Sequence, residues 1–153
     1  MIREYESADL EDMLNTWEAA SAVAHPFLSE EFIEQERHNI PNVYVPMAEA
    51  WVWEADGRVV GLIALIGNEV GAIFVEPQFQ GGGIGRALMD RARDVRGELE
   101  VEVFTANTIG RAFYDRYGFE LMHEKIHEPT GFEVMRLKLS AEAPPQPSES
   151  AAG

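Results

Sequence analysis

Four glycines stand close together where a strand-like segment gives way to a helical one, in the run Gln80-Gly81-Gly82-Gly83-Ile84-Gly85-Arg86. A glycine in a helical turn costs about 1 kcal/mol relative to alanine, so this run weakens the start of the helix that follows. A helix N-terminus carries unpaired N–H groups and partial positive charge. Bare backbone lets an anion touch several of these groups at once, and Arg86 adds a charge suited to phosphate. We expect a phosphate site here, with a flexible strand-to-helix hinge as the alternative.

Two familiar phosphate-binding motifs do not match this run. A Walker A loop ends in Gly-Lys-Ser/Thr, whereas Gly85 is followed by Arg86. A dinucleotide fingerprint starting at Gly81 or Gly83 would need glycine or alanine where the chain has Arg86 or Leu88. The phosphate therefore belongs to another class of ligand.

The hydrophobic pattern predicts one α/β domain, an α+β mixed sheet with helices on its faces, in the order β-α-α-β-β-β-α-β-α-β-β. The predicted elements occupy, in turn, residues 2–6, 8–22, 30–38, 49–55, 58–66, 70–77, 84–96, 99–104, 108–117, 119–127 and 131–139. Ser7, Ser29 and Asn107 are expected to cap helices, and Asp56-Gly57 predicts a hairpin. Residues 39–47 are expected to form a loop. Residues 141–153 have little to bury and are expected to form a disordered tail after a domain of residues 1–140.

Composition and charge exclude several classes of function. The chain has no cysteine, which rules out disulfides, cysteine-based metal sites and thiol nucleophiles, and we expect no metal. Its 27 acidic and 12 basic residues give a net charge of −15, which argues against nucleic-acid binding. No run reaches the ~18 apolar residues of a membrane span. We therefore expect a cytoplasmic protein, monomer or homodimer, whose acidic surface serves either solubility or a cationic partner.

Two sequence blocks together resemble the GNAT N-acetyltransferase superfamily. The acyl-CoA motif of that family, Arg/Gln-x-x-Gly-x-Gly/Ala, is matched by Gln80 to Gly85. The stretch NTIGRAFYDRYGFEL, residues 107–121, is similar to the next block of the family. Both blocks stand in the right order within the predicted topology, so residues 1–140 resemble a small bacterial-type single-domain member.

The resemblance implies acetyl-CoA as cosubstrate and assigns residues to it. The pyrophosphate would lie on the glycine run, and the pantetheine arm would pair with the strand edge ending at Phe74 and Val75. Asn107 would contact the arm from the other side, and its alternative role is that of an ordinary helix cap. The implied cofactor-binding set is Phe74, Val75, Gln80, Gly81, Gly82, Gly83, Ile84, Gly85, Arg86 and Asn107.

The resemblance also implies the chemistry of acetyl transfer. A backbone N–H near Val75 would polarise the thioester, and Tyr114 would give a proton to the departing sulfur, unless it is only a buried core aromatic. An alkyl amine of pKa ~10.4 is only about 1 part in 2,500 neutral at pH 7, so a base is needed. Glu69 is the first candidate, with a solvated turn residue as its alternative role. His25 is the second candidate.

The resemblance places the acceptor between residues 24–32 and 126–131. Trp17, His25 and Phe27, with Trp51, would form an aromatic wall there, unless Trp17 and Trp51 are core residues. The sequence thus predicts an N-acetyltransferase that acts on a primary amine, cationic when free, of a small molecule or peptide. The alternative is a noncatalytic acetyl-CoA sensor. Tyr114 favours the enzyme, because a sensor needs no acid at the sulfur.

Overall fold

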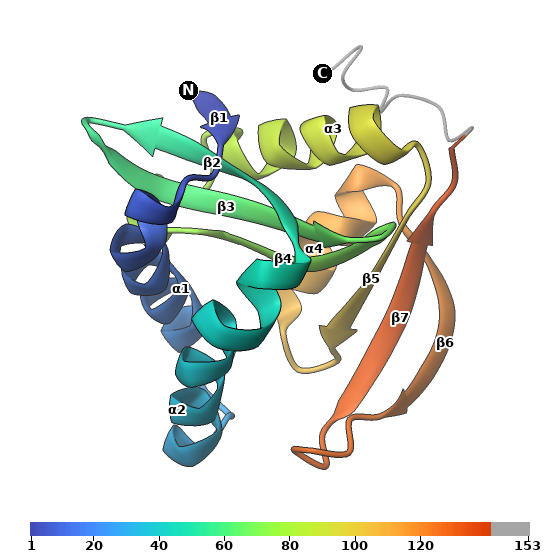
Figure 1. The fold of residues 1–153 in the computed structure, drawn as a ribbon. Helices are drawn as coiled ribbons and strands as arrows, with labels where there is room; N and C mark the ends of the chain where they lie inside the picture. Colours follow the sequence, from blue (N-terminus) through green and yellow to red (C-terminus); the bar gives the residue numbers. More distant parts are fainter. Residues whose placement is uncertain (142–153) are drawn as a thin grey trace.

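A seven-stranded sheet of order β1-β2-β3-β4-β5-β7-β6 runs through the computed structural model, which describes residues 1–141 (Figure 1). All neighbouring strands are antiparallel except β4 and β5, which are parallel. The strands are β1 (Ile2–Glu4), β2 (Glu49–Ala55), β3 (Arg58–Ile66), β4 (Glu69–Val75), β5 (Leu99–Phe104), β6 (Glu120–Ile126) and β7 (Glu133–Leu139). The helices are α1 (Leu10–Ala24), α2 (Glu30–Asn39), α3 (Ile84–Arg96) and α4 (Thr108–Tyr117). This confirms the predicted α/β fold and the order of its elements.

The local signals for helix ends and turns account for much of this agreement. The Ser29 hydroxyl accepts a hydrogen bond from the Phe32 N–H at 3.0 Å and caps α2. Gly118 ends α4 in the left-handed conformation, with φ of 116°. Asp56 and Gly57 both have positive φ, 55° and 79°, as a two-residue hairpin turn requires.

Two local predictions are wrong. Residues 40–47 are not loop: a π-helical turn, Ile40–Tyr44, continues α2 and is followed by a 3-10 turn, Val45–Met47. A proline, Pro41 or Pro46, stands within the first two positions of each turn. Ser7 does not cap α1, because the chain enters it through a 3-10 turn in which the Asp9 carboxylate accepts from the Glu6 N–H. Apart from Ala141, the predicted tail lies outside the described residues.

The helices cover opposite faces of the sheet, and each face has its own core (Figure 1). On one face α1 packs on β3 and β4, where Met13 and Leu62 are buried together. On the other face α3 and α4 cover a larger core that contains Leu88, Val101 and Tyr114. Within residues 1–141 no helix is long and apolar enough to cross a membrane.

The sheet opens between its two parallel strands. β4 and β5 pair only at their first residues, Glu69 with Glu100 and Val70 with Val101. Beyond that point β4 stays paired with β3 as far as Val75, while β5 pairs with β7 as far as Phe104. The carboxyl-terminal half of β4 therefore has an unpaired edge toward β5, and the candidate site is built around this opening.

Candidate active site

A cleft of about 620 Å³ occupies the opening between β4 and β5. One wall is formed by Ile73, Phe74 and Val75 of β4, and the glycine run closes one end. Residues in or next to α1, α2, β5 and α4 complete the lining, and His25, Asn107 and Tyr114 are among them. The cleft thus brings together elements from across the sequence, and we call it the donor cleft.

The glycines of the run differ in what they do for this cleft. Gly81 and Gly83 have φ of 86° and 92°, in the region that favours glycine, and a Cβ at either would meet no atom within 4 Å. Gly85 lies against the Phe113 ring, 3.3 Å from the place of its missing Cβ. These three line the cleft, whereas Gly82 does not. The first i→i−4 bond of α3 runs from the Ala87 N–H to the Gly83 carbonyl, so the three preceding amides lack helical partners.

The other residues assigned to this run take separate positions. Gln80 lines the cleft, and its Nε2 donates to the Val75 carbonyl at 2.9 Å. Arg86 also lines the cleft and lies 5.1 Å from the centre of the Tyr117 ring. Ile84 is buried in the core instead, in line with the hydrophobic stripe of α3. It is close enough to Gly61 that a Cβ there would lie 3.2 Å from the Ile84 Cγ2.

The edge of β4 offers main-chain groups to the cleft. The Glu76 N–H donates to the Val60 carbonyl at 2.8 Å, so Glu76 and Phe74 direct their main-chain groups toward β3. Because successive residues of a strand alternate, Ile73 and Val75 direct theirs toward the opening. An extended ligand with amide groups can pair with this edge as an added strand.

Tyr114 is a buried residue of the cleft lining. Its side chain is 7% exposed and packs edge-on against Phe113 and Phe119, with ring centres 5.5 and 5.4 Å away. Burial raises the pKa of the Tyr114 hydroxyl, so this group stays protonated and can only donate a proton. Within residues 1–141 it has no hydrogen-bond partner in protein. A buried donor in a cleft is therefore available to a ligand.

Asn107 and His25 meet across the cleft from two helices. The Asn107 Oδ1 accepts from the Gly110 N–H at 2.9 Å, which confirms the predicted cap of α4. Its Nδ2 lies 3.2 Å from the His25 Nε2. Burial lowers the pKa of His25, and the amide donor opposite Nε2 favours the neutral ring with its proton on Nδ1.

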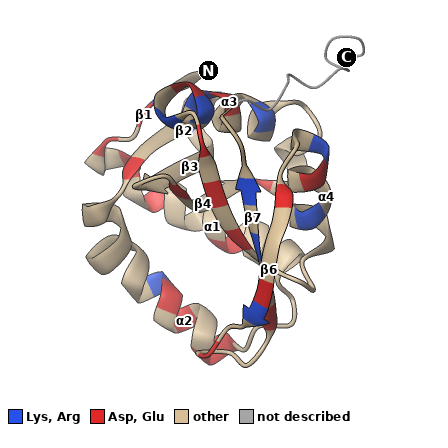
Figure 2. Cartoon of the chain, turned by 90° about the vertical axis from the view of Figure 1, so that its right-hand side faces the viewer, with Lys and Arg blue, Asp and Glu red and all other residues tan. Residues whose placement is uncertain are grey.

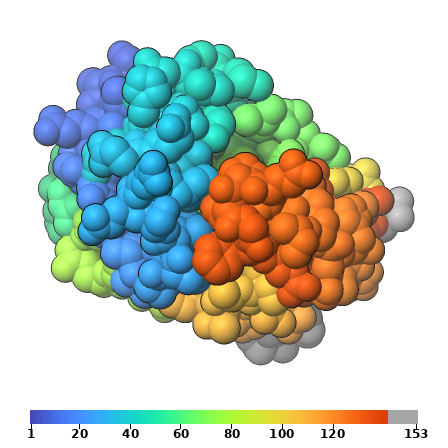
Figure 3. Space-filling view, turned by 90° about the horizontal axis from the view of Figure 1, so that it is seen from below, coloured from blue at the N-terminus to red at the C-terminus, as the bar shows by residue number. Residues whose placement is uncertain are grey.

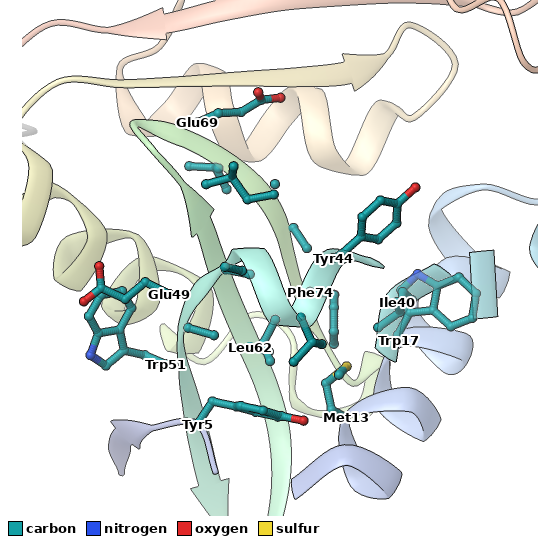
Figure 4. Close-up of a pocket in the computed structure, with 18 of the residues that line it drawn as sticks. Tyr5, Met13, Trp17, Ile40, Tyr44, Glu49, Trp51, Leu62, Glu69 and Phe74 are labelled. Atoms are coloured by element: carbon teal, nitrogen blue, oxygen red, sulfur yellow. The ribbon is translucent and has the colours of Figure 1, made fainter. Parts of the chain in front are cut away.

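A second cavity of about 600 Å³, the acceptor cavity, lies between α1, the π-helical turn and the sheet (Figure 4). Trp17, Ile40 and Tyr44 stand on its helical side, with Phe74 beside them and Met13 below, and Glu69 lies at the far end. Trp51, at 5% exposed, belongs mainly to the core. Eight residues line both cavities: Trp17, Glu36, Val70, Gly71, Ala72, Phe74, Glu102 and His127. The two cavities therefore meet at β4.

Phe27 lines neither cavity. Its ring packs against those of Phe104 and Phe132, with centres 5.5 and 5.0 Å away, and against His25. These contacts join the α1–α2 loop to β5 and to the β6–β7 hairpin, and the N-terminal helices and the hairpin meet in this way on the lower face of the molecule (Figure 3). Phe27 thus contacts the cleft residues His25 and Phe104 and forms no wall of either cavity itself.

Ion pairs hold most of the acidic side chains near the acceptor cavity. Glu69, the first residue of β4, is 41% exposed and lies 3.1 Å from Arg136, which also pairs with Glu100 at 2.9 Å. Glu102 pairs with Lys125 at 3.1 Å. Figure 2 shows blue stretches of β7 among red segments of the neighbouring strands. Within the described residues no group of His, Asp and Glu is arranged to hold a metal ion.

Sequence reasoning did not select three residues where the cavities meet: Glu36, Glu102 and His127. Glu102 alternates with the buried side chains of β5, a signal that places it on the opposite face of the sheet. His127 lies in the hairpin expected beside the acceptor, and its Nδ1 is 2.9 Å from the Thr130 Oγ1. Glu36 lies in the predicted second helix, but its contact with Tyr44 depends on the helical continuation of α2, which the sequence did not indicate.

Comparison with known proteins agrees with this geometry. A family model described as an acetyltransferase (GNAT) domain matches residues 46–121. The peptidyl-lysine N-acetyltransferase YiaC of Escherichia coli (strain K12) is 31% identical over 123 residues, which cover 80% of this chain and 84% of YiaC. The peptidyl-lysine N-acetyltransferase YjaB of the same strain is 30% identical over 122 residues, which cover 78% of this chain and 82% of YjaB.

Solved structures show the same fold. The solution structure of apo YjaB from Escherichia coli has a TM-score of 0.80 and 25% identity, covering 90% of this chain and 95% of that one. PaiA N-acetyltransferase from Thermoplasma acidophilum, in complex with coenzyme A, has a TM-score of 0.68 and 21% identity. The match covers 91% of this chain and 98% of PaiA. Since its sequence blocks, its fold and its relatives agree, the chain belongs to the GNAT acetyltransferase family.

Proposed function

We propose that this protein transfers the acetyl group of acetyl-CoA to a primary amine of a small molecule or peptide, with the lysine side chain of a peptide as the best supported acceptor. The observation that carries the proposal is the meeting of the donor cleft with the acceptor cavity along β4. Two substrates bound from opposite sides can react at such a junction without leaving the protein. The names of YiaC and YjaB as peptidyl-lysine N-acetyltransferases support the acceptor class.

The donor cleft suits coenzyme A in shape and polarity. In this proposal the pyrophosphate lies on the amides from Gly81 to Arg86, and the pantetheine arm pairs with the edge of β4 that ends at Phe74 and Val75. Gln80 holds the Val75 carbonyl, and the Val75 N–H, which faces the opening through strand alternation, polarises the thioester in this proposal. The coenzyme A complex of PaiA, a protein of the same fold, supports this placement.

The proposed chemistry is direct attack by the neutral amine on the thioester carbon. The carbon–sulfur bond breaks, the sulfur takes the electron pair, and Tyr114 donates a hydrogen bond or its proton to it. Glu69 receives the proton that the acceptor loses, directly or through water. Trp17 and His25 contact the acceptor or the acetyl group, and Phe27 supports His25.

We further propose that the acceptor is cationic when free, because five glutamates line the acceptor cavity and no lysine or arginine does. A reaction in the cytoplasm remains our expectation. The test is a screen of amines and lysine peptides with acetyl-CoA, in which a thiol reagent detects free coenzyme A and mass spectrometry locates the acetyl group. If the protein binds acetyl-CoA but acetylates no amine, the proposal is wrong and the alternative, a noncatalytic acetyl-CoA sensor, is favoured.

A further inference from the structure

The five glutamates of the acceptor cavity are not equivalent, because three already have a cationic partner. Glu49 lies 2.7 Å from Arg96, Glu69 lies 3.1 Å from Arg136, and Glu102 lies 3.1 Å from Lys125. Glu4 and Glu36 form no ion pair with any lysine or arginine in the part of the chain that the structure describes. A negative charge in a cavity without a cation of its own attracts one from a ligand.

Position separates the two remaining glutamates. Glu4 is exposed at the end of β1 and lines only the acceptor cavity. Glu36 is half-buried on the last turns of α2 and lines both the acceptor cavity and the donor cleft. Only Glu36 therefore combines a free negative charge with a place at the junction where transfer would occur.

The π-helical turn holds the Glu36 side chain from one side. The Tyr44 hydroxyl donates to the Glu36 Oε2 at 3.2 Å, and the Asn39 Nδ2 lies 3.5 Å from the same oxygen. Burial, with the negative charge of Glu36 as the next cause, raises the pKa of Tyr44, so its hydroxyl remains a donor. Both contacts use Oε2, which leaves Oε1 without a hydrogen bond from residues 1–141.

Apolar side chains line the acceptor cavity together with Glu36. Trp17 and Ile40 both stand on the helical side of the acceptor cavity (Figure 4). Arg37 lies 6.0 Å from the Trp17 ring but is paired with Glu18, so it does not neutralise Glu36. An alkyl chain that ends in an ammonium group would match this arrangement, with the chain on Trp17 and Ile40 and the charge on Glu36.

We propose that Glu36, positioned by Tyr44, is the residue that selects an alkylammonium acceptor such as a lysine side chain. The inference rests on the proposed function and concerns binding of the acceptor before its proton is lost. It predicts discrimination against a ligand of the same length without the charge. It also predicts discrimination against an α-amino acid, because its carboxylate would meet Glu36 and the neighbouring glutamates.

A pair of peptides isolates the charge: acetyl-Ala-Lys-Ala-amide and the same peptide with norleucine, titrated calorimetrically with coenzyme A present. Wild type should bind the lysine peptide about five- to tenfold more tightly, the range for a hydrogen-bonded ion pair at a partly buried site. Glu36→Gln should remove this preference. The matched control is Glu34→Gln, an exposed glutamate of the same helix that lines neither cavity and should keep the preference.

Turnover gives a second readout that separates the two proposals. Glu36→Gln should raise KM for the lysine peptide about five- to tenfold, with kcat and the KM for acetyl-CoA little changed. An equal preference for lysine over norleucine in wild type and Glu36→Gln would overturn the role of Glu36. If wild type acetylates no amine, the proposed function fails, but the calorimetric comparison still decides whether Glu36 binds the ammonium.

Discussion

The Asn107 side-chain amide lies 3.2 Å from the Nε2 of His25, and this contact joins the start of α4 to the end of α1 across the donor cleft. The same Asn107 side chain caps α4 through its oxygen, so one residue fixes a helix end and a second element. The amide offers Nε2 a donor, and a protonated imidazole has no acceptor to meet it. The contact therefore depends on the neutral form of His25.

This dependence predicts a loss of stability in acid. Burial lowers the pKa of His25 in the folded protein below the ~6.5 of the unfolded chain, so below that pH the unfolded chain binds more protons. The free energy of unfolding should fall as pH drops through ~6.5, until the folded-state pKa of His25 is passed. Urea unfolding of wild type and His25→Gln between about pH 8 and about pH 5 measures the effect.

His25→Gln is the informative variant because its amide oxygen can accept from Asn107 but cannot titrate. The difference in unfolding free energy between wild type and variant should shrink as pH falls. Taking this difference cancels the contribution of the other three histidines, which both proteins share. A difference that stays constant over this range would mean that His25 is equally protonated in both states.

A second prediction concerns the glycine run. Any side chain at Gly83 strains the backbone, because φ there is 92°, so Gly83→Glu alone would confuse strain with charge. Gly83→Gln carries the same strain without the charge. If the amides of this run bind the pyrophosphate, Gly83→Glu should bind coenzyme A at least about tenfold more weakly than Gly83→Gln in calorimetry. Equal affinity in the two folded variants would contradict the assignment.

How far the sequence predicts the fold depends on how local the signals are. Ser29, Asn107 and the Asp56-Gly57 turn act within a few residues of themselves, and the structure confirms each of them. The alternation in residues 99–104 depends only on one face of β5 being buried, as Leu99, Val101 and Val103 are. These signals suffice for the order of the elements.

The site is harder to predict because it depends on long-range placement. Residues 39–47 were expected to form a loop, yet prolines 41 and 46 each fall early in a helical turn, where proline is tolerated. The resulting turn brings Tyr44 back to Glu36, eight residues earlier, and no local pattern indicates that contact. Phe27 was expected to line the acceptor site, but its partners Phe104 and Phe132 come from distant strands and draw its ring into their own cluster.

A third prediction concerns the two tyrosines of α4. Tyr114→Phe should lower kcat roughly 10- to 1,000-fold and leave the affinity for acetyl-CoA nearly intact, because the lost hydrogen bond strengthens only as the thiolate forms. The aromatic contacts with Phe113 and Phe119 are kept in this variant. Steady-state kinetics and calorimetry measure the two effects.

Tyr117 is the matched control. Its hydroxyl donates to Asp90 on α3, and the residue does not line the donor cleft. Tyr117→Phe should therefore reduce stability with kcat near that of wild type. Equal kcat in Tyr114→Phe and wild type would assign Tyr114 to the core alone.

A fourth prediction concerns Glu69. If Glu69 is the base, Glu69→Gln should lower kcat/KM for the amine roughly 10²- to 10⁴-fold and leave the binding of acetyl-CoA unchanged. Glu100→Gln is the control, since Glu100 shares Arg136 with Glu69 but lines neither cavity. Should both variants lose activity to the same degree, the cause is the disturbed Arg136 and not a missing base.

The last prediction uses the net charge of −15 and the glutamates of the acceptor cavity. A negative surface steers cations inward, so kcat/KM for a cationic amine should fall as salt rises, by up to about tenfold. Charges beyond ~8 Å are screened at physiological ionic strength, so measurements from about 20 mM to about 300 mM salt span the effect. The same carboxylates raise the pKa of the bound ammonium and oppose the neutral form that reacts, so the rate should also rise with pH.

Acetyl-CoA is an anion and provides an internal control of opposite sign, because salt should raise kcat/KM for acetyl-CoA or leave it unchanged. A parallel fall for both substrates would indicate that salt inactivates the enzyme, and no fall for the amine would leave the acidic surface with a role in solubility alone.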